Sequence, residues 1–193
     1  AGAGVDIIDQ DVRFAGFDLT RDRLRVAFLR LGLDARDTNF SDPRFTSAEP
    51  RWRVAGTLEL RQGLAALGAS DGCGPAFVRC GFGVVPPARA EGDPQASVLR
   101  GAVIAEARPG PGVTVAAGIR AQYSADPLFS FEEFSVGNYT VGRGLDPGIL
   151  LGDSGLGLQA ELRFGSAVPP TTTAFAAEPF LFVDRAWVWN RDL

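Results

Sequence analysis

The sequence predicts an all-β protein, and three observations support this prediction. Apolar and polar residues alternate with a period of two over several stretches, as they do along strands with two different faces. Gly and Pro account for 24 and 13 of the 193 residues, and they fall mostly in clusters between those stretches, where turns would join the strands. No stretch has the period of an amphipathic helix. The chain is therefore expected to be a succession of strands and turns.

The alternation is clearest at 52–61, 113–124 and 156–165. In the second of these stretches one face carries Val113, Val115, Ala117, Ile119, Ala121 and Tyr123. The other face carries Thr114, Ala116, Gly118, Arg120, Gln122 and Ser124. Each stretch is therefore expected to be a strand with one apolar and one more polar face.

Strand length favours a membrane protein over a soluble one. The clear stretches run for about nine to thirteen residues, whereas strands of globular proteins average about five or six and membrane-spanning strands need about nine to eleven. No run of about 18 apolar residues is present, so the membrane alternative requires a β-barrel. We therefore expect an antiparallel transmembrane β-barrel. A soluble β-sandwich would show the same alternation, and it stays open as an alternative.

Further strands are expected at 12–19, 23–33, 96–108 and 178–190, where the alternation is poorer. Short and long connections then alternate, as in bacterial outer-membrane barrels, with long ones at 64–95 and 125–154. The stretch 34–51 departs from this rule, because it is long where a short turn is expected. The total of about seven strands is odd, whereas such barrels have even numbers, so an incomplete barrel or a missed strand is expected.

The two cysteines, Cys73 and Cys80, are separated by six residues rich in Gly, Pro and apolar side chains. Such a spacing favours a disulfide in an oxidising compartment, with two free thiols or a metal site as alternatives. Zinc is disfavoured because two cysteines without any histidine supply too few ligands. No metal and no cofactor is expected.

Composition and motifs exclude several function classes. The net charge of −4 and the lack of a basic stripe argue against nucleic-acid binding. Gly152-Asp153-Ser154-Gly155 looks like a serine-protease motif, but the chain has no histidine to act as a base. Carboxylates such as Glu132, Glu161 and Asp184 are plentiful, yet nothing pairs them across a cleft as a glycosidase requires. No catalytic residue is therefore predicted, and the protein is not expected to be an enzyme.

Two segments carry a family resemblance. Residues 131–144 resemble the approach to loop six of the two-partner secretion transporters, the haemolysin secretion/activation family. Val141-Gly142-Arg143-Gly144-Leu145 stands where that family has Val-Arg-Gly-aromatic, with an added glycine and a leucine for the aromatic residue. Residues 182–186, Phe-Val-Asp-Arg-Ala, resemble the family's Phe-x-Asp-x-Gly wall motif. The likeness is best over 113–190.

The resemblance implies a site and a fold. Loop 125–154 would fold into the barrel, where Arg143 would pair with Asp184 of the wall, and Val141, Gly144 and Phe182 would belong to the same contact. Without the resemblance, Arg143 would be taken as an exposed loop charge. The family's barrel has sixteen strands and follows periplasmic domains, so residues 1–193 are expected to be one barrel segment. The lack of Met likewise suggests a matured chain or a fragment.

The resemblance also implies a function. The protein would lie in the bacterial outer membrane, contact its lipid, and export an unfolded exoprotein partner of the haemolysin or adhesin type, without ATP. An assembly factor of the same superfamily, which inserts other barrels, is the first alternative. A soluble β-sandwich binding module is the second.

Overall fold

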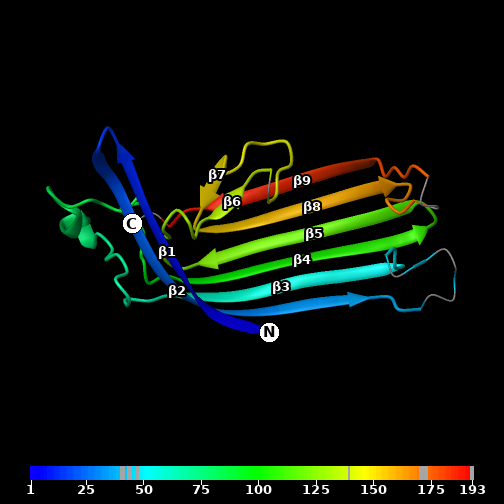
Figure 1. Cartoon of the computed structure of the whole chain (residues 1–193), viewed down its shortest axis with the longest axis horizontal. Coiled ribbons are helices and arrows are strands. Elements are labelled where there is room, and N and C mark those ends of the chain that lie inside the picture. The colour runs from blue at the N-terminus through cyan, green and yellow to red at the C-terminus, as the bar shows by residue number, and fades with distance from the viewer. Residues whose placement is uncertain (40–41, 43–44, 47, 139, 170–173, 192–193) are drawn as a thin grey trace.

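The computed structural model describes residues 1–39, 42, 45–46, 48–138, 140–169 and 174–191. Within these residues one long antiparallel sheet, the main sheet, has the order β1-β2-β3-β4-β5-β8-β9 (Figure 1). Its strands are β1 (Gly2–Phe14), β2 (Phe17–Arg36), β3 (Trp52–Gly63), β4 (Ser97–Gly110), β5 (Val113–Ser124), β8 (Ser154–Phe164) and β9 (Phe180–Trp189). A small hairpin of β6 (Phe134–Val136) and β7 (Leu150–Gly152) is inserted between β5 and β8. A short 3₁₀ helix, η1 (Pro75–Cys80), lies between β3 and β4.

The main sheet is curved and open, with β1 and β9 at its edges (Figure 1). Each strand pairs with its predecessor in the sheet in antiparallel register, for example from Trp52–Ala107 to Gln62–Ser97 between β3 and β4. The register shifts near the end of two ladders, at Val12–Arg13 of β1 and at Ala107–Gly110 of β4. This is the meander of an up-and-down barrel, in the form of a barrel segment. The described residues contain no helix that is both long and apolar enough to cross a membrane.

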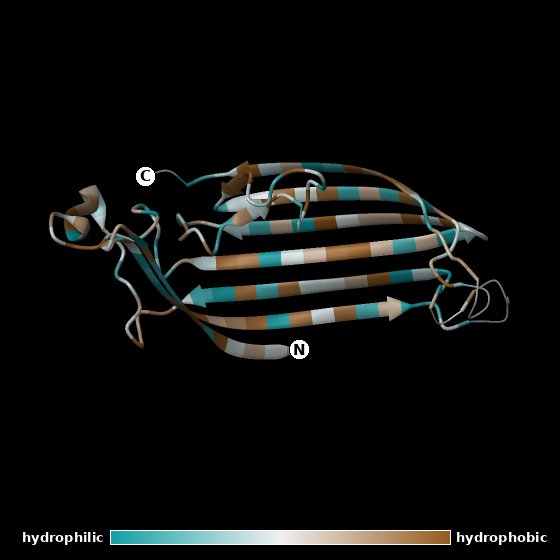
Figure 2. Ribbon diagram, turned by 45° about the horizontal axis from the view of Figure 1, so that its top comes forward, coloured by the Kyte–Doolittle hydropathy of each residue, from teal (hydrophilic) through white to brown (hydrophobic). Residues whose placement is uncertain are grey.

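The two faces of the main sheet differ sharply in polarity, and Figure 2 shows the resulting alternation along the strands. On β5, Ile119 and Tyr123 are 54% and 56% exposed on the outer face. Their neighbours Thr114, Gln122 and Ser124 are buried on the inner face. A soluble sandwich buries its apolar face, so this arrangement is the reverse and fits a barrel with lipid outside and a polar interior.

The first two strands differ from the sequence-based prediction. Strands were expected at 12–19 and 23–33, but the chain turns at Ala15 and Gly16 and then continues as the 20-residue β2. Both turn residues have positive φ angles, 49° and 86°. Ala rarely adopts that conformation, so the dipeptide gave no turn signal. The short hairpin strands β6 and β7 were also missed, because three residues show no periodicity.

The expected alternation of short and long connections holds only in part. The long segments 64–96 and 125–153 lie at one end of the main sheet, but so does the tight turn at Ala15–Gly16 (Figure 1). The other end holds the short turn at 111–112 together with the longer connections 37–51 and 165–179. Pro170 and Thr171–Thr173 of the last connection lie outside the described residues, as does Tyr139.

The buried apolar side chains lie where connections pack onto the inner face. Segment 125–153, hereafter the inward loop, supplies five of the twelve found among the described residues. Its residues Leu128 and Phe129 pack against apolar side chains of β2, β4 and Ala96. Further along, Phe134, Val136 and Val141 form a second group with Ala186 and Val188 of β9. The inner face is therefore covered by the inward loop, and this packing positions the candidate site.

Candidate functional site

Gln122 of β5 joins residue 132 near the start of the inward loop to residue 153 at its end. The Gln122 side-chain amide donates to the main-chain oxygens of Glu132, at 2.7 Å, and of Asp153, at 3.1 Å. Just beyond, the main-chain N–H of Ser124 donates to the hydroxyl of Ser154, and that hydroxyl lies 3.2 Å from the Ser124 carbonyl. The loop thus leaves and rejoins the wall at nearly the same point.

The tip of the inward loop is a compact turn that requires glycine. Gly137 has a φ of 148°, and a Cβ atom there would lie 2.4 Å from the Asp146 carbonyl oxygen. Its N–H donates to the Val141 carbonyl at 2.8 Å, which closes the turn. Val141 is buried against the wall, and a Cβ atom on Gly157 of β8 would lie only 2.7 Å from it. The small residue in the wall allows the loop tip to approach closely.

Arg143 projects from this turn onto the inner face of β8 and β9. Its Nη2 lies 2.8 Å from Oδ1 of Asp184 and its Nε lies 3.1 Å from Oδ2. The same guanidinium contacts the carboxylate of Glu161 and lies over the Phe182 ring, 4.1 Å from its centroid. The main-chain N–H groups of Gly142 and Arg143 also donate to Asp184 Oδ2, at 3.1 and 2.9 Å. The hydrogen bond between the guanidinium and Asp184 raises the pKa of Arg143 above its ordinary value, so it stays charged.

The structure brings four of the five residues of the anticipated contact together. Arg143 touches both Asp184 and Phe182, and Val141 holds the turn against the wall. Gly144 does not line the contact. It has a φ of 86°, and open space surrounds the position of a Cβ atom, so the backbone angle alone explains glycine there.

Glu161 was not anticipated as part of this contact. It faces Phe182 across the β8–β9 ladder and also contacts Arg163, which in turn lies 3.1 Å from Glu106. The sequence signal was its strand parity, shared with Gln159 and Arg163. Only the pairing register of β8 and β9 shows that Glu161 lies opposite Phe182 and therefore next to Arg143.

A second ionic cluster, also not anticipated, centres on Glu132 near the start of the inward loop. Arg61 of β3 approaches both carboxylate oxygens of Glu132 at 2.9 Å. Arg100 of β4 donates to the Glu132 carboxylate at 3.0 Å and to its carbonyl at 2.8 Å. Arg61 also lies 2.9 Å from Glu59 and 2.8 Å from Asp6. The residues come from distant parts of the sequence, so no local motif marks this cluster.

A third ionic cluster lies at the end of the main sheet where the connections 64–96 and 125–153 are found, hereafter the long-loop end. Asp153 is fully buried and accepts hydrogen bonds from the Arg89 guanidinium and from the N–H groups of Leu128 and Arg191, the last two at 2.7 and 2.6 Å. Burial opposes its ionisation, but the hydrogen bonds prevail and hold its pKa below the ordinary value. Burial raises the pKa of the neighbouring Glu133, which lies 3.1 Å from Arg89.

The connection 64–96 carries the two cysteines at the same end. Cys73 and Cys80 form a disulfide, with Cα atoms 5.1 Å apart, that closes the segment containing η1. Over the described residues there is no free cysteine and no group of three or more residues suited to hold a metal ion.

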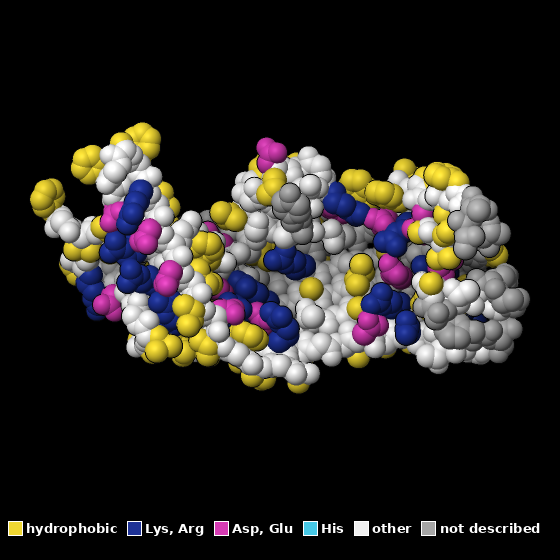
Figure 3. All heavy atoms as spheres, viewed as in Figure 1, with side chains coloured by type: hydrophobic (Ala, Val, Ile, Leu, Met, Phe, Trp, Pro, Cys, Tyr) yellow, Lys and Arg dark blue, Asp and Glu magenta, His cyan; other side chains and the backbone are white. Residues whose placement is uncertain are grey.

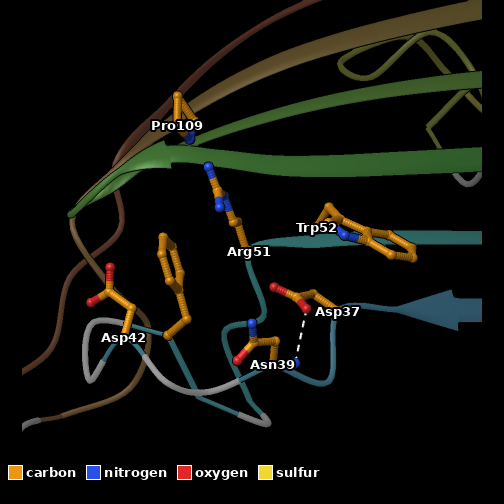
Figure 4. Close-up of a pocket in the computed structure, with 7 residues that line it drawn as sticks. Asp37, Asn39, Asp42, Arg51, Trp52 and Pro109 are labelled. Atoms are coloured by element: carbon orange, nitrogen blue, oxygen red, sulfur yellow. Dashed lines mark hydrogen bonds between the residues drawn. The ribbon is translucent and has the colours of Figure 1, made fainter.

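A polar hollow lies at the opposite end, between the 37–51 connection and Pro109 (Figure 4). Its volume is about 510 Å³, and Asp37, Asn39 and Arg51 contribute polar groups. The Asp37 carboxylate accepts a hydrogen bond of 2.9 Å from the Asn39 N–H, which stabilises the turn after β2. Trp52 lies at the rim (Figure 4). None of the anticipated site residues lies in this hollow.

The chemical character of the inner face is that of a mixed ionic surface. Figure 3 shows arginine and acidic side chains gathered together rather than in patches of one sign. All 19 basic residues of the chain are arginines, whose planar guanidinium groups suit paired contacts with carboxylates. Such contacts can hold a loop in one position and can be exchanged for water when the loop moves.

Residues 46–192 match the family model described as haemolysin secretion/activation protein ShlB/FhaC/HecB. The chain belongs to this family. The match covers about three quarters of the chain, from β3 to the end of β9, and includes the inward loop. The ShlB/FhaC/HecB proteins are β-barrel transporters of two-partner secretion in the outer membrane, and both the strand content and the polarity of the main sheet agree with that membership. No curated protein and no solved structure matches the chain.

Proposed function

We propose that this protein exports an unfolded exoprotein partner, of the haemolysin or adhesin type, through the interior that the inward loop occupies. It acts as a transporter and not as an enzyme. The observation that carries the proposal is the contact of Arg143 with Asp184 and Glu161, which ties the tip of the inward loop to the wall. Export then requires that the loop move out of the interior so that the exoprotein can pass.

The character of the inner face supports passage of an unfolded chain. An extended polypeptide exposes its N–H and C=O groups, which need hydrogen-bond partners along the way. The inner face offers both donors and acceptors of this kind, among them Arg120, Gln159 and Arg163. Because positive and negative side chains alternate on the inner face, acidic and basic segments of the exoprotein can both pass without binding tightly to the wall.

The contact between Arg143 and Asp184 is of a strength that allows it to open. The Asp184 side chain is 4% exposed, whereas that of Arg143 is 26% exposed, so water reaches one partner. A contact of this kind is weaker than a fully buried ion pair, and it requires no ATP or cofactor to break. An exoprotein segment that competes for the same carboxylates would displace the loop.

Export is tested by expressing the protein together with a candidate exoprotein of the haemolysin or adhesin type. The secreted protein is measured in the medium, and unrelated outer-membrane barrels are measured in the membrane fraction. Loss of export in Arg143→Ala with unchanged barrels supports the transporter. A general loss of barrels would favour an assembly factor, and recovery of the protein from a detergent-free soluble fraction would contradict both membrane functions.

A further inference from the structure

We propose that Glu132 anchors the root of the inward loop to the wall independently of Arg143. The tip can then leave β8 and β9 while the root stays in place. The anchor is a property of the loop, and only its consequence for export rests on the proposed function. Residues 128–132 are called the root, and residues 136–138 and 140–145 the tip.

The root is fixed by a buried carboxylate with guanidinium partners on neighbouring strands. Glu132 is 6% exposed, and its two oxygens are each 2.9 Å from a nitrogen of Arg61, which is 5% exposed. Arg100 adds contacts of 3.0 Å to the carboxylate and 2.8 Å to the carbonyl. Paired guanidinium–carboxylate contacts in a water-poor place fix orientation as well as position.

Apolar packing holds the same segment. Leu128 and Phe129 are each 1% exposed, and they contact groups that include Val98 and Val26. Phe129 also fills space above Gly92, where a Cβ atom would lie 2.4 Å from the ring. The root is thus embedded against β2, β4 and the end of the 64–96 connection.

Root and tip use different parts of the wall. The root contacts β2, β3, β4 and Gln122 of β5, whereas the tip contacts Asp184, Glu161 and Phe182 of β8 and β9. No described residue serves both contacts. The root contact includes a guanidinium that is drier than that of the tip, because the side chain of Arg61 is 5% exposed and that of Arg143 is 26% exposed, whereas Arg100 at the root is 28% exposed. Separate contacts of unequal burial open separately, the wetter one first.

Removal of the Glu132 charge should leave the fold intact. In Glu132→Gln, Arg61 keeps its contacts with Glu59 and Asp6. Arg100 loses its carboxylate partner but keeps its hydrogen bonds to the Gln122 side chain and to the main-chain oxygen of residue 132. The Gln122 amide still meets the main-chain oxygen of residue 132. What is lost is the ionic tie between the wall and the root.

Reporter cysteines separate the two contacts. Leu128→Cys reports on the root, and Val136→Cys, 2% exposed in the native chain, reports on the tip. Each is placed in outer-membrane vesicles and labelled with a membrane-impermeant maleimide, while the native pair stays in its disulfide. Glu132→Gln should raise the labelling rate at position 128 by about tenfold or more. Arg143→Ala should raise it at position 136 and leave position 128 protected.

Glu91→Gln is the matched control, because it removes one exposed carboxylate from the 64–96 connection. If Leu128→Cys alone disturbs packing, Ala96→Cys, which packs against Leu128, replaces it as the reporter. Equal exposure of both reporters in Arg143→Ala, or protection of the root in Glu132→Gln, would overturn the proposal. Export is measured on the same strains: the expected labelling pattern without any export by the unmodified protein would leave the anchor standing and refute the proposed transport role.

Discussion

The Asp184 carboxylate accepts both the guanidinium and the main-chain N–H of Arg143, with Arg143 N 2.9 Å from Oδ2 and Nη2 2.8 Å from Oδ1. One wall residue therefore fixes the backbone and the side chain of the loop residue at once. A substitution of either partner disturbs the position of the loop tip as well as its charge balance.

Arg143→Ala and Asp184→Ala should each reduce export, and the double variant should be no worse than the poorer single one, because the two residues act as a unit. Each loss should cost roughly 1–3 kcal/mol of loop attachment, less than for a fully buried pair, since Arg143 is partly hydrated. Arg143→Lys should restore only part of the export, because an ammonium group lacks the planar fork that matches the two oxygens of Asp184 and stacks on Phe182. Quantitative immunoblots of the medium provide the measurement.

The control for these variants is Arg185→Ala. Arg185 is the next residue along β9, lies on the outer face, and stacks on Trp187 at 4.7 Å. Its removal should leave export close to that of the unmodified protein. Native export from both Arg143→Ala and Asp184→Ala would remove the role given to the pair.

A pair of substitutions on β3 tests which face meets lipid. Leu58 is 49% exposed on the outer face, and Leu58→Arg should cost roughly 2–4 kcal/mol near the membrane midplane. Thr57, on the inner face, should accept arginine with little loss. Folded barrel is measured by its heat-modifiable mobility on gels after mild detergent extraction. Equal behaviour of the two variants would contradict the assignment of the faces.

The Asp153 cluster should make the long-loop end sensitive to acid. Because the pKa of Asp153 is lowered from its ordinary 3.8, its contribution to stability is present above that value and is lost as the pH falls through the lower, folded pKa. Asp153→Asn should cost roughly 2–4 kcal/mol at neutral pH, since Arg89 loses a buried partner. Thermal unfolding followed by intrinsic fluorescence at several pH values measures both effects.

Glu133→Gln is the matched control at the neighbouring position. The pKa of Glu133 is raised from 4.5 by burial, so its ionised form weakens the fold as the pH rises through the raised pKa. The amide should therefore leave stability at neutral pH unchanged or improve it. A loss in Glu133→Gln as large as that in Asp153→Asn would argue against the assigned roles.

The disulfide should be present in protein taken from the membrane. Unreduced protein should be lighter by two hydrogens than the reduced form, and Cys73 and Cys80 should resist alkylation until reduced. Replacing both cysteines by serine should loosen the 64–96 connection, by about 2–3 kcal/mol for so small a loop, and leave the main sheet intact. Mass spectrometry with and without reductant decides the first point, and ready alkylation of native protein would contradict it.

The strands were predictable where a full span alternates without interruption. The prediction of 113–124 coincides with β5, because every second side chain there is apolar. At Ala15–Gly16 the alternation carried across a turn, so the prediction for the first hairpin was wrong. The sequence also predicted the contact of Arg143 with Asp184, because each residue lies in a segment that resembles a motif of the family. The sequence could not predict the contact of Glu132 with Arg61. The two residues are 71 positions apart, and only the arrangement of the strands in the sheet brings them together.

The hydrogen bond between Ser124 and Ser154, the two residues that flank the inward loop, bears on how wide the passage can become. The ladder between β5 and β8 runs unbroken from Val113–Phe164 to Gln122–Gly155, directly below the loop. A loop whose ends are neighbours can swing aside without parting those strands. The circumference of a barrel is set by its strand number and stagger, and neither changes in such a movement. The passage would therefore widen by the volume that the loop leaves, while the circumference of the barrel stays the same.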